Sequence, residues 1–335
     1  MDFCHYRSRL APAERQAYDA MTAALLALEE SARVPLLPME TLSDLFFCLR
    51  LDHPQVFYVS GFSLRRIPQS ASGEVIFQYE FKKDKLRSQQ SALETRLTRL
   101  LRPMQALPSD TDRLYAIHDF LVQSVRYDKL RKYYSHEIIG SLHNGVGVCE
   151  GLAKTFKLLC DRLHIECLIP ISEADPENGV PYRHAWNIVR LGGQTYHIDA
   201  TFDLSLSTPS LTRYDYFCLS DRQIFRDHLP LLHPVPACTD GSRSAYRAHS
   251  LTLTDPTGLP KLLRTAIRKK QGGAAFVWLG EQPLRDVLPT LRQTIADTLR
   301  DTGKNGVLHC NPTQNVVAVL FGAADETILL DQPQP

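Results

Sequence analysis

Three residue types that together activate a sulfur nucleophile occur in the middle of the chain. Cys149 lies in a glycine-rich stretch, Gly147-Val148-Cys149-Glu150-Gly151, and His184 and Asp199 follow it in that order. A cysteine attacks a carbonyl carbon when a histidine accepts its proton and a carboxylate orients the imidazole. The sequence therefore predicts chemistry at an amide or peptide bond, provided that the three side chains meet in space.

The segment after Cys149 is expected to form a helix from Gly151 to about Leu163. Leu152 and Phe156 begin its apolar stripe, and Cys149 is in phase with that stripe. In the first turn of a helix, backbone N–H groups and the helix dipole favour an anion, which lowers the pKa of a thiol. The same N–H groups could stabilise an oxyanion. The alternative is a buried structural cysteine, and the position at a helix start argues against it.

Two expected strands, 184–191 and 194–201, carry the other two residues, and a two-glycine turn joins them. In the register that this turn sets, Asp199 lies opposite Trp186 and diagonal to His184 on one face. Diagonal neighbours are about 7–8 Å apart, within reach of long side chains. A slip by one residue would move Asp199 to the other face, so the register is a sharp prediction.

Four further residues are expected to contact the substrate, namely Glu150, Tyr134, His136 and Trp186. Tyr134 and His136 belong to the segment 127–147, which is expected to be a loop. Loops that lead into an active-site helix often form a wall of the cleft.

Other titratable residues nearby are weaker candidates. His197 falls on the same strand face as His184 but farther from the expected cleft, and Asp203 could replace Asp199 only if the strand ended early. Cys160 and Cys167 lie in apolar segments, where a small thiol usually belongs to the core.

The flanking sequence predicts an accessory region before the core and a small α/β domain after it. Apolar periodicity and alternation predict helices at 11–32, 40–51, 85–106, 111–125, 259–270 and 284–300, and strands at 57–64, 73–81, 274–279, 307–310 and 316–321. Ser109 or Asp110 is expected to cap the helix at 111–125. The expected organisation is an N-terminal region of helices and a β-hairpin at 1–108, a catalytic core at 109–233, a linker at 234–256 and a small α/β domain at 257–335.

Composition excludes several classes of partner. The net charge of +1 over 335 residues gives no electrostatic case for nucleic acid or an anionic membrane. No apolar run approaches the roughly 20 residues of a membrane span, and the N-terminus has no apolar signal core, so we expect a cytoplasmic protein. The 8 cysteines form no Cys-x-x-Cys pair. We therefore expect free thiols, no bound metal and no cofactor.

The motifs around these residues resemble a known family. Gly-Val-Cys149-Glu-Gly-x-Ala, His184-Ala-Trp-Asn and Tyr-His-Ile-Asp199-Ala-Thr-x-Asp are similar, over about residues 110–205, to the three motifs of the transglutaminase-like superfamily of papain-like cysteine enzymes. The resemblance implies an α+β fold, in which a helix carrying Cys149 packs on an antiparallel sheet carrying His184 and Asp199. It also implies that Cys149 is the nucleophile, His184 the general base and acid, and Asp199 its orienter.

One position next to the nucleophile differs from animal transglutaminases, which carry an aromatic residue just after the cysteine where this chain has Glu150. An acidic residue at this position resembles the bacterial branch of the superfamily, whose members include protease-like proteins. The chain also lacks the zinc-binding Cys-x-x-Cys pairs of the related peptide N-glycanases, which distinguishes it from those enzymes. The leading hypothesis is a peptidase or amidohydrolase that acts on a protein or peptide through an acyl-thioester. A protein-glutamine acyltransferase and a catalytically silent binding module are the alternatives. The sequence leaves the oligomeric state open.

Overall fold

The computed structural model describes residues 3–175, 177 and 182–322, and the chain divides into two compact units. The first unit is Met1–Gly193 and the second is Gln194–Pro335. The boundary follows the two-glycine turn predicted from the sequence, which is confirmed because Gly192 and Gly193 both have positive φ, 56° and 83°. The domain boundaries expected above stay predictions, and the last residues of the 257–335 segment lie outside the described residues.

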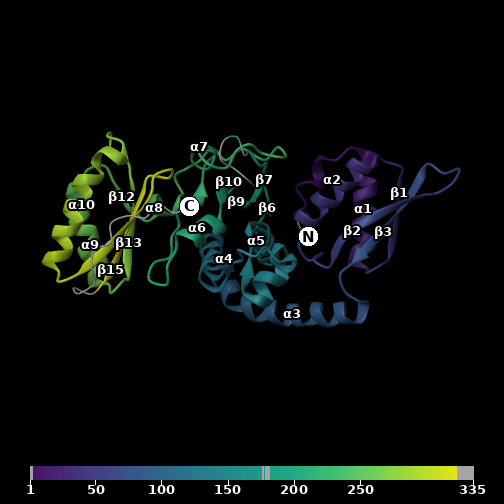
Figure 1. Ribbon diagram of the computed structural model, residues 1–335, viewed down its shortest axis with the longest axis horizontal. Coiled ribbons are helices and arrows are strands. Elements are labelled where there is room, and N and C mark those ends of the chain that lie inside the picture. The colour runs from purple at the N-terminus through teal and green to yellow at the C-terminus, as the bar shows by residue number, and fades with distance from the viewer. Residues whose placement is uncertain (1–2, 176, 178–181, 323–335) are drawn as a thin grey trace. The chain divides into compact units, whose positions relative to one another are not determined.

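The first unit begins with a three-stranded sheet of order β1-β3-β2, and α1 packs against β1 and against α2 (Figure 1). The elements are α1 (Pro12–Leu26), β1 (Ser31–Pro35), α2 (Met39–Asp52), β2 (Val59–Arg66) and β3 (Ser72–Tyr79). The prediction of one helix over 11–32 is wrong at its end. Leu28 adopts a left-handed φ of 57°, which stops the helix, and β1 then pairs with β3.

Two helices lead to the core, α3 (Lys83–Gln105) and α4 (Asp110–Ser124). The cap predicted for α4 is confirmed at Ser109, whose hydroxyl accepts a hydrogen bond from the Asp112 N–H at 3.1 Å.

The following segment is more ordered than the predicted loop. It contains β4 (Arg126–Tyr127), the 3-10 helix η2 (Tyr133–His136), the π-helical turn η3 (Gly140–Asn144) and β5 (Val146–Gly147). Gly140 allows this close packing, because a Cβ there would lie 2.5 Å from the carbonyl oxygen of Tyr134.

Helix α5 (Cys149–Arg162) packs against short antiparallel strand pairs in the first unit. Strand β6 (Cys167–Leu168) pairs with β9 (Asn187–Leu191), and β7 (Ile171–Ser172) pairs with β8 (His184–Ala185). The expected continuous strand over 184–191 is thus interrupted at Trp186, whose N–H reaches the carbonyl oxygen of Pro170 at 3.4 Å.

The second unit opens with β10 (Gln194–Ile198), which pairs antiparallel with β11 (Phe217–Leu219). The expected strand over 194–201 is wrong at its end, because Asp199 caps the helix α6 (Ala200–Leu206). The short helix α7 (Asp221–Ile224) follows β11.

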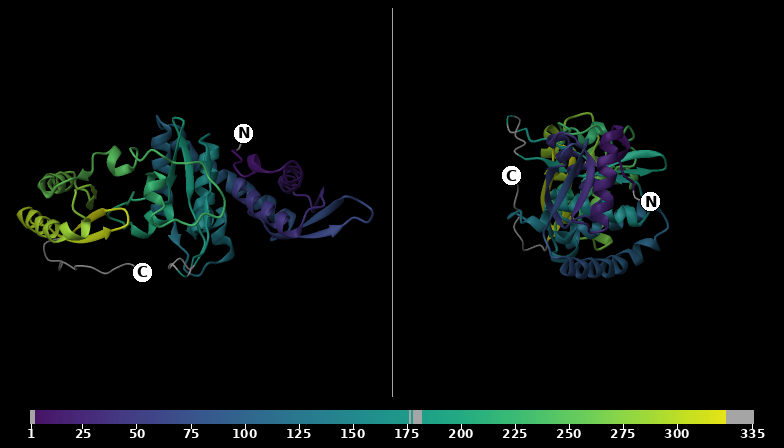
Figure 2. Two further views of the ribbon diagram at one scale, coloured as in Figure 1. Left: turned by 90° about the horizontal axis from the view of Figure 1, so that it is seen from above. Right: turned by 90° about the vertical axis from the view of Figure 1, so that its right-hand side faces the viewer.

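The rest of the second unit is a four-stranded sheet of order β12-β13-β15-β14. Figure 2 shows its helices α9 and α10 lying side by side, and their apolar residues form one core with one face of the sheet. The elements are α8 (Ala245–Ala248), β12 (Thr252–Leu253), α9 (Leu259–Arg268), β13 (Gly273–Trp278), α10 (Leu284–Asp301), β14 (Asn305–Asn311) and β15 (Val316–Gly322). The segment 234–256, expected to be a linker, therefore contributes a helical turn and a strand.

Helices and small, mainly antiparallel sheets make this an α+β protein, as predicted. Within the described residues, no helix combines the length and the apolar character needed to cross a membrane.

Candidate active site

Cys149 is the first residue of α5, as the glycine-rich entry predicts. Its side chain is partly exposed, whereas every residue from Gly151 to Cys160 is buried. The helix therefore runs through the interior and presents its N-terminal cysteine at an accessible end.

Contacts with the segment 133–137 fix this end of α5. The Val148 N–H donates to the Ser135 carbonyl oxygen at 3.0 Å. A Cβ on residue 151 would lie 2.1 Å from that same oxygen, so only glycine fits at this position. The Gly147 carbonyl oxygen in turn accepts from the Asp128 N–H at 3.0 Å. The backbone on both sides of Cys149 is thus held in place.

A buried charge network begins at Glu150, the residue after the cysteine. The Lys154 ammonium, which is fully buried, lies 2.7 Å from the Glu150 carboxylate and 3.0 Å from the Glu137 carboxylate. Arg50, from α2, forms an ion pair with Glu137, and the His136 Nδ1 lies 3.2 Å from Glu150. Two carboxylates and two side chains with permanent positive charge balance one another here.

The network keeps Glu150 ionised. Burial alone would raise the pKa of the Glu150 carboxyl, but Lys154, His136 and Arg50 outweigh burial and hold that pKa well below its ordinary value. Sequence reasoning missed Lys154 and Arg50, although the four-residue spacing of Glu150 and Lys154 is a usable signal. The contacts of Glu150 and His136 with a substrate stay predictions.

His184 begins β8, on which α5 packs. Its ring lies stacked with the indole of Trp186, with centroids 6.0 Å apart and ring planes 12° from parallel. Trp186 is 1% exposed, so its indole forms a fixed support for the imidazole. The predicted substrate contacts of Trp186 and Tyr134 stay predictions; Tyr134 is half-buried in η2.

Asp199 is anchored within the second unit at the N-cap of α6. Its Oδ1 accepts hydrogen bonds from the Thr201 and Phe202 N–H groups at 2.8 and 3.2 Å. Its Oδ2 lies 2.9 Å from the Nε2 of His228, which is fully buried. The other ring nitrogen of His228 lies 2.6 Å from Asp227.

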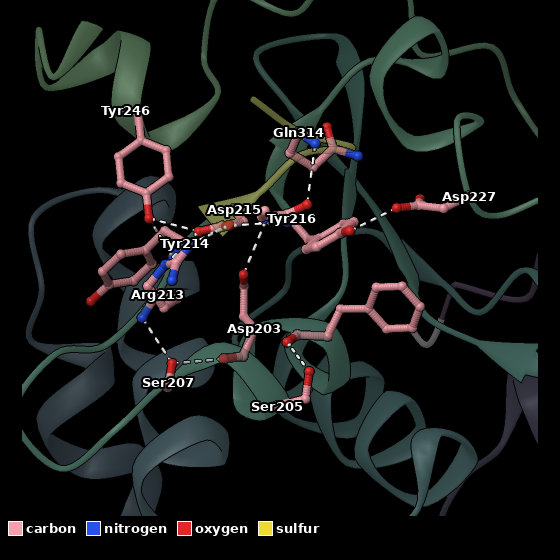
Figure 3. A network of polar contacts seen from close by, with 12 residues as sticks. Asp203, Ser205, Ser207, Arg213, Tyr214, Asp215, Tyr216, Asp227, Tyr246 and Gln314 are labelled. Atoms are coloured by element: carbon pink, nitrogen blue, oxygen red, sulfur yellow. Dashed lines mark hydrogen bonds and ion pairs between the residues drawn. The ribbon is translucent and has the colours of Figure 1, made fainter. Parts of the chain in front are cut away.

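His228 was not a candidate from the sequence, because no motif surrounds it and it is far from Asp199 along the chain. The Tyr216 hydroxyl donates a hydrogen bond to the Asp227 carboxylate at 2.7 Å (Figure 3). A chain of polar groups, of which His228 and Tyr216 are buried, thus holds the Asp199 carboxylate. Its expected pairing with His184 stays a prediction.

The competing residues have structural partners. Asp203 lies near the Tyr216 N–H, with its two carboxylate oxygens at 3.1 and 3.3 Å (Figure 3). Burial lowers the pKa of His197, against the opposing effect of Asp221 at 2.8 Å. Cys160 and Cys167 are fully buried, as predicted, and burial raises the pKa of the Cys160 thiol.

Residues 98–200 match the family model of the transglutaminase-like superfamily. The chain therefore contains a transglutaminase-like domain, and the resemblance drawn from the three motifs is confirmed. A comparison with curated proteins gives no match.

Three solved structures are similar to parts of the chain. A structure titled as a TGase has 13% identity and a TM-score of 0.29, over 51% of this chain and 52% of that one. A candidate cysteine protease from Cytophaga hutchinsonii has 14% identity and a TM-score of 0.29, over 43% and 62%. A candidate protease from Parabacteroides distasonis has 10% identity and a TM-score of 0.25, over 42% and 36%. The chain thus spans less than two thirds of the length of each of these three solved structures.

Proposed function

We propose that this protein is a thiol-dependent enzyme that cleaves an amide or peptide bond, with Cys149 as nucleophile, His184 as general base and acid, and Asp199 as the residue that orients the imidazole. The observation that carries the proposal is the placement of Cys149, partly exposed, at the N-terminus of a helix that is otherwise buried. The transglutaminase-like domain at 98–200 supports it.

The first step follows from the environment of Cys149. A helix N-terminus favours the thiolate, and the adjacent Glu150 does not oppose this effect because Lys154 neutralises it at 2.7 Å. The thiolate attacks the carbonyl carbon, and backbone N–H groups of the first turn of α5 stabilise the oxyanion. When the C–N bond breaks, His184 donates its proton to the leaving amine, and the acyl group stays on Cys149 as a thioester.

The second step needs His184 as a base. A water molecule gives its proton to the imidazole while its oxygen attacks the thioester, which releases a carboxylic acid and the thiol. The support of Trp186 under the ring favours one imidazole orientation. The contacts of Asp199 with α6 and His228 favour one orientation of its carboxylate, which is what an orienting residue requires.

The acceptor distinguishes a hydrolase from an acyltransferase, since both use the same first step. We propose hydrolysis as the main reaction, because Glu150 replaces the aromatic residue that animal transglutaminases carry after the cysteine. The substrate is a protein or peptide.

The test combines two measurements on one set of peptides. Mass spectrometry would detect new termini in a peptide library, and ammonia release from glutamine peptides would be measured with and without an added amine. New termini that disappear in Cys149→Ala but persist in Cys310→Ala, another partly exposed cysteine, support the hydrolase. Ammonia release with amine incorporation and without new termini would replace it with the acyltransferase. No reaction of either kind would leave the binding module as the better hypothesis.

A further inference from the structure

Strand β13 has an open edge in the second unit. On one side it pairs with β15 from Gly273 to Val277, whereas on the other side β12 pairs only with Val277 and Trp278. Among the residues that the structure describes, no strand continues β12 alongside Gly273 and Ala275. Both residues are buried and α8 packs against β13, so this unpaired part of the edge lies within a pocket and not on the open surface.

The hydrogen-bond pattern shows which groups face that edge. Backbone groups of successive strand residues point to opposite neighbours. The Val277 N–H donates to the Leu251 carbonyl oxygen at 3.0 Å and the Leu279 N–H to that of Leu253 at 2.7 Å. By the same alternation, the N–H and C=O groups of Gly273 and Ala275 point toward the β12 side, ahead of the place where β12 begins.

A cavity of about 820 Å³ lies along this edge. Gly273, Ala274 and Ala275 form part of its lining, and Leu262 of α9 and Tyr246 of α8 also contribute. Pockets of about 300–1,000 Å³ are typical for small ligands. We call this cavity the β13 groove.

One wall of the β13 groove is held by a buried polar network (Figure 3). The Tyr246 hydroxyl donates to Asp215 at 2.8 Å, and the Arg213 guanidinium forms two bonds with the same carboxylate, at 2.9 and 2.6 Å. Asn311 donates to it at 3.0 Å. Tyr246 is therefore fixed before any ligand arrives, which reduces the entropy that binding must overcome.

The side chains that line the β13 groove determine which charge on a ligand is favoured. Lys261 and Lys269 contribute to the lining, and none of the described lining residues is Asp or Glu. The potential along the groove thus favours carboxylates.

We propose that the β13 groove binds an extended peptide segment with acidic side chains, which adds a strand to the open edge of β13. Backbone hydrogen bonds to Gly273 and Ala275 would supply affinity for any extended chain, and Lys261 and Lys269 would select acidic side chains. The inference assigns a partner class to the C-terminal part of the chain and does not depend on Cys149.

Fluorescence anisotropy of the full chain with a labelled acetyl-Glu-Val-Glu-Val-Glu-amide peptide tests the proposal. The Cys149→Ala variant should bind the peptide as the wild type does. Lys261→Glu and Lys269→Glu should each weaken binding about fivefold or more, since each reverses a charge near the ligand. Arg268→Glu is the matched control, because it lies on the same helix but outside the lining, and it should change binding less than twofold (about 0.4 kcal/mol).

A second peptide tests strand addition itself. N-methylation of alternate residues removes the backbone donors that pair with an edge strand, so one of the two alternating patterns should bind at least about tenfold more weakly. Equal binding of all three peptides, equal loss with Arg268→Glu, or tighter binding of a single-stranded oligonucleotide would overturn the proposal. It would also fail if the chain self-associated through this groove and the peptide did not compete.

Discussion

Replacing Lys154 with methionine tests the buried network beside the nucleophile. The substitution keeps most of the side-chain volume and removes one charge. Glu150 and Glu137, which lie 2.7 and 3.0 Å from the ammonium, would then be left with Arg50 and His136 as neighbours. We expect Lys154→Met to lower the free energy of unfolding and to slow the alkylation of Cys149.

The magnitude follows from the distances and the burial. At an effective dielectric constant of about 20, a charge pair at such a distance is worth about 6 kcal/mol, against several kcal/mol for taking the ammonium out of water. Removing one partner of a fully buried pair typically costs about 3–5 kcal/mol, because the remaining charge stays buried. The uncompensated Glu150 also disfavours a thiolate next to it, so the pH–rate profile of alkylation should move to higher pH.

Lys157→Met is the matched control. Lys157 is also fully buried in α5 and lies 2.7 Å from Asp161, so its loss should destabilise the fold similarly. It lies eight residues from Cys149, or about 12 Å along the helix, so the alkylation profile should not move. Urea unfolding and iodoacetamide labelling from pH 5 to 9 measure the two effects.

A double variant isolates the charge effect. Adding Glu150→Gln to Lys154→Met removes the unpaired carboxylate next to the cysteine, and the alkylation profile should return toward that of the wild type. The reasoning is refuted if Lys154→Met costs less than about 1 kcal/mol, the level of an exposed pair. It is also refuted if Lys157→Met shifts the alkylation profile equally.

Three further predictions concern other parts of the fold. Burial raises the pKa of Asp52 from 3.8 to about 6, so the contribution of this carboxyl to stability should be greatest below pH 4 and should fall by up to about 3 kcal/mol as pH rises through 6; the difference in free energy of unfolding between wild type and Asp52→Asn, from urea titrations at several pH values, should follow this dependence. Gly151→Ala forces a Cβ against the Ser135 carbonyl and should cost at least about 1–3 kcal/mol in thermal unfolding, with loss of Cys149 labelling. His228→Gln should lower kcat about 10- to 100-fold with little change in KM. A raised KM with an unchanged kcat would contradict the role of His228 in holding the carboxylate.

The sequence predicted long elements well because their signals are local. Helix α2 and helix α10 begin and end within a residue or so of the expected bounds, since apolar periodicity and prolines mark them. The short elements β12 and α8 were missed, because a few residues carry no periodicity. The helix that ends at Leu26 was extended too far, because nothing in the sequence announces the left-handed backbone of Leu28.

The site was partly predictable for the same reason. Residues adjacent in the sequence predict the helix start at Cys149 and the N-cap at Ser109. The burial of Lys154 and Lys157 was not predictable, because in a helix with one apolar stripe lysines are expected to face water. Each lysine is buried because a distant segment supplies a partner, Glu137 for Lys154 and the Phe3 carbonyl oxygen for Lys157. Contacts of this kind depend on the tertiary fold.

The activation of Cys149 by His184 is the central claim, and the pH dependence of its alkylation tests it most directly. Cys4 and Cys310 are also partly exposed and serve as internal controls; Cys4, whose Sγ lies 3.6 Å from the His53 Nε2, also controls for the mere proximity of a histidine. Peptide mapping after iodoacetamide treatment should show Cys149 reacting at pH 6 at least about tenfold faster than either control, and this advantage should disappear in His184→Ala. If Cys149 instead reacts with the profile of an ordinary thiol of pKa about 8.5, with or without His184, the proposed nucleophile is contradicted.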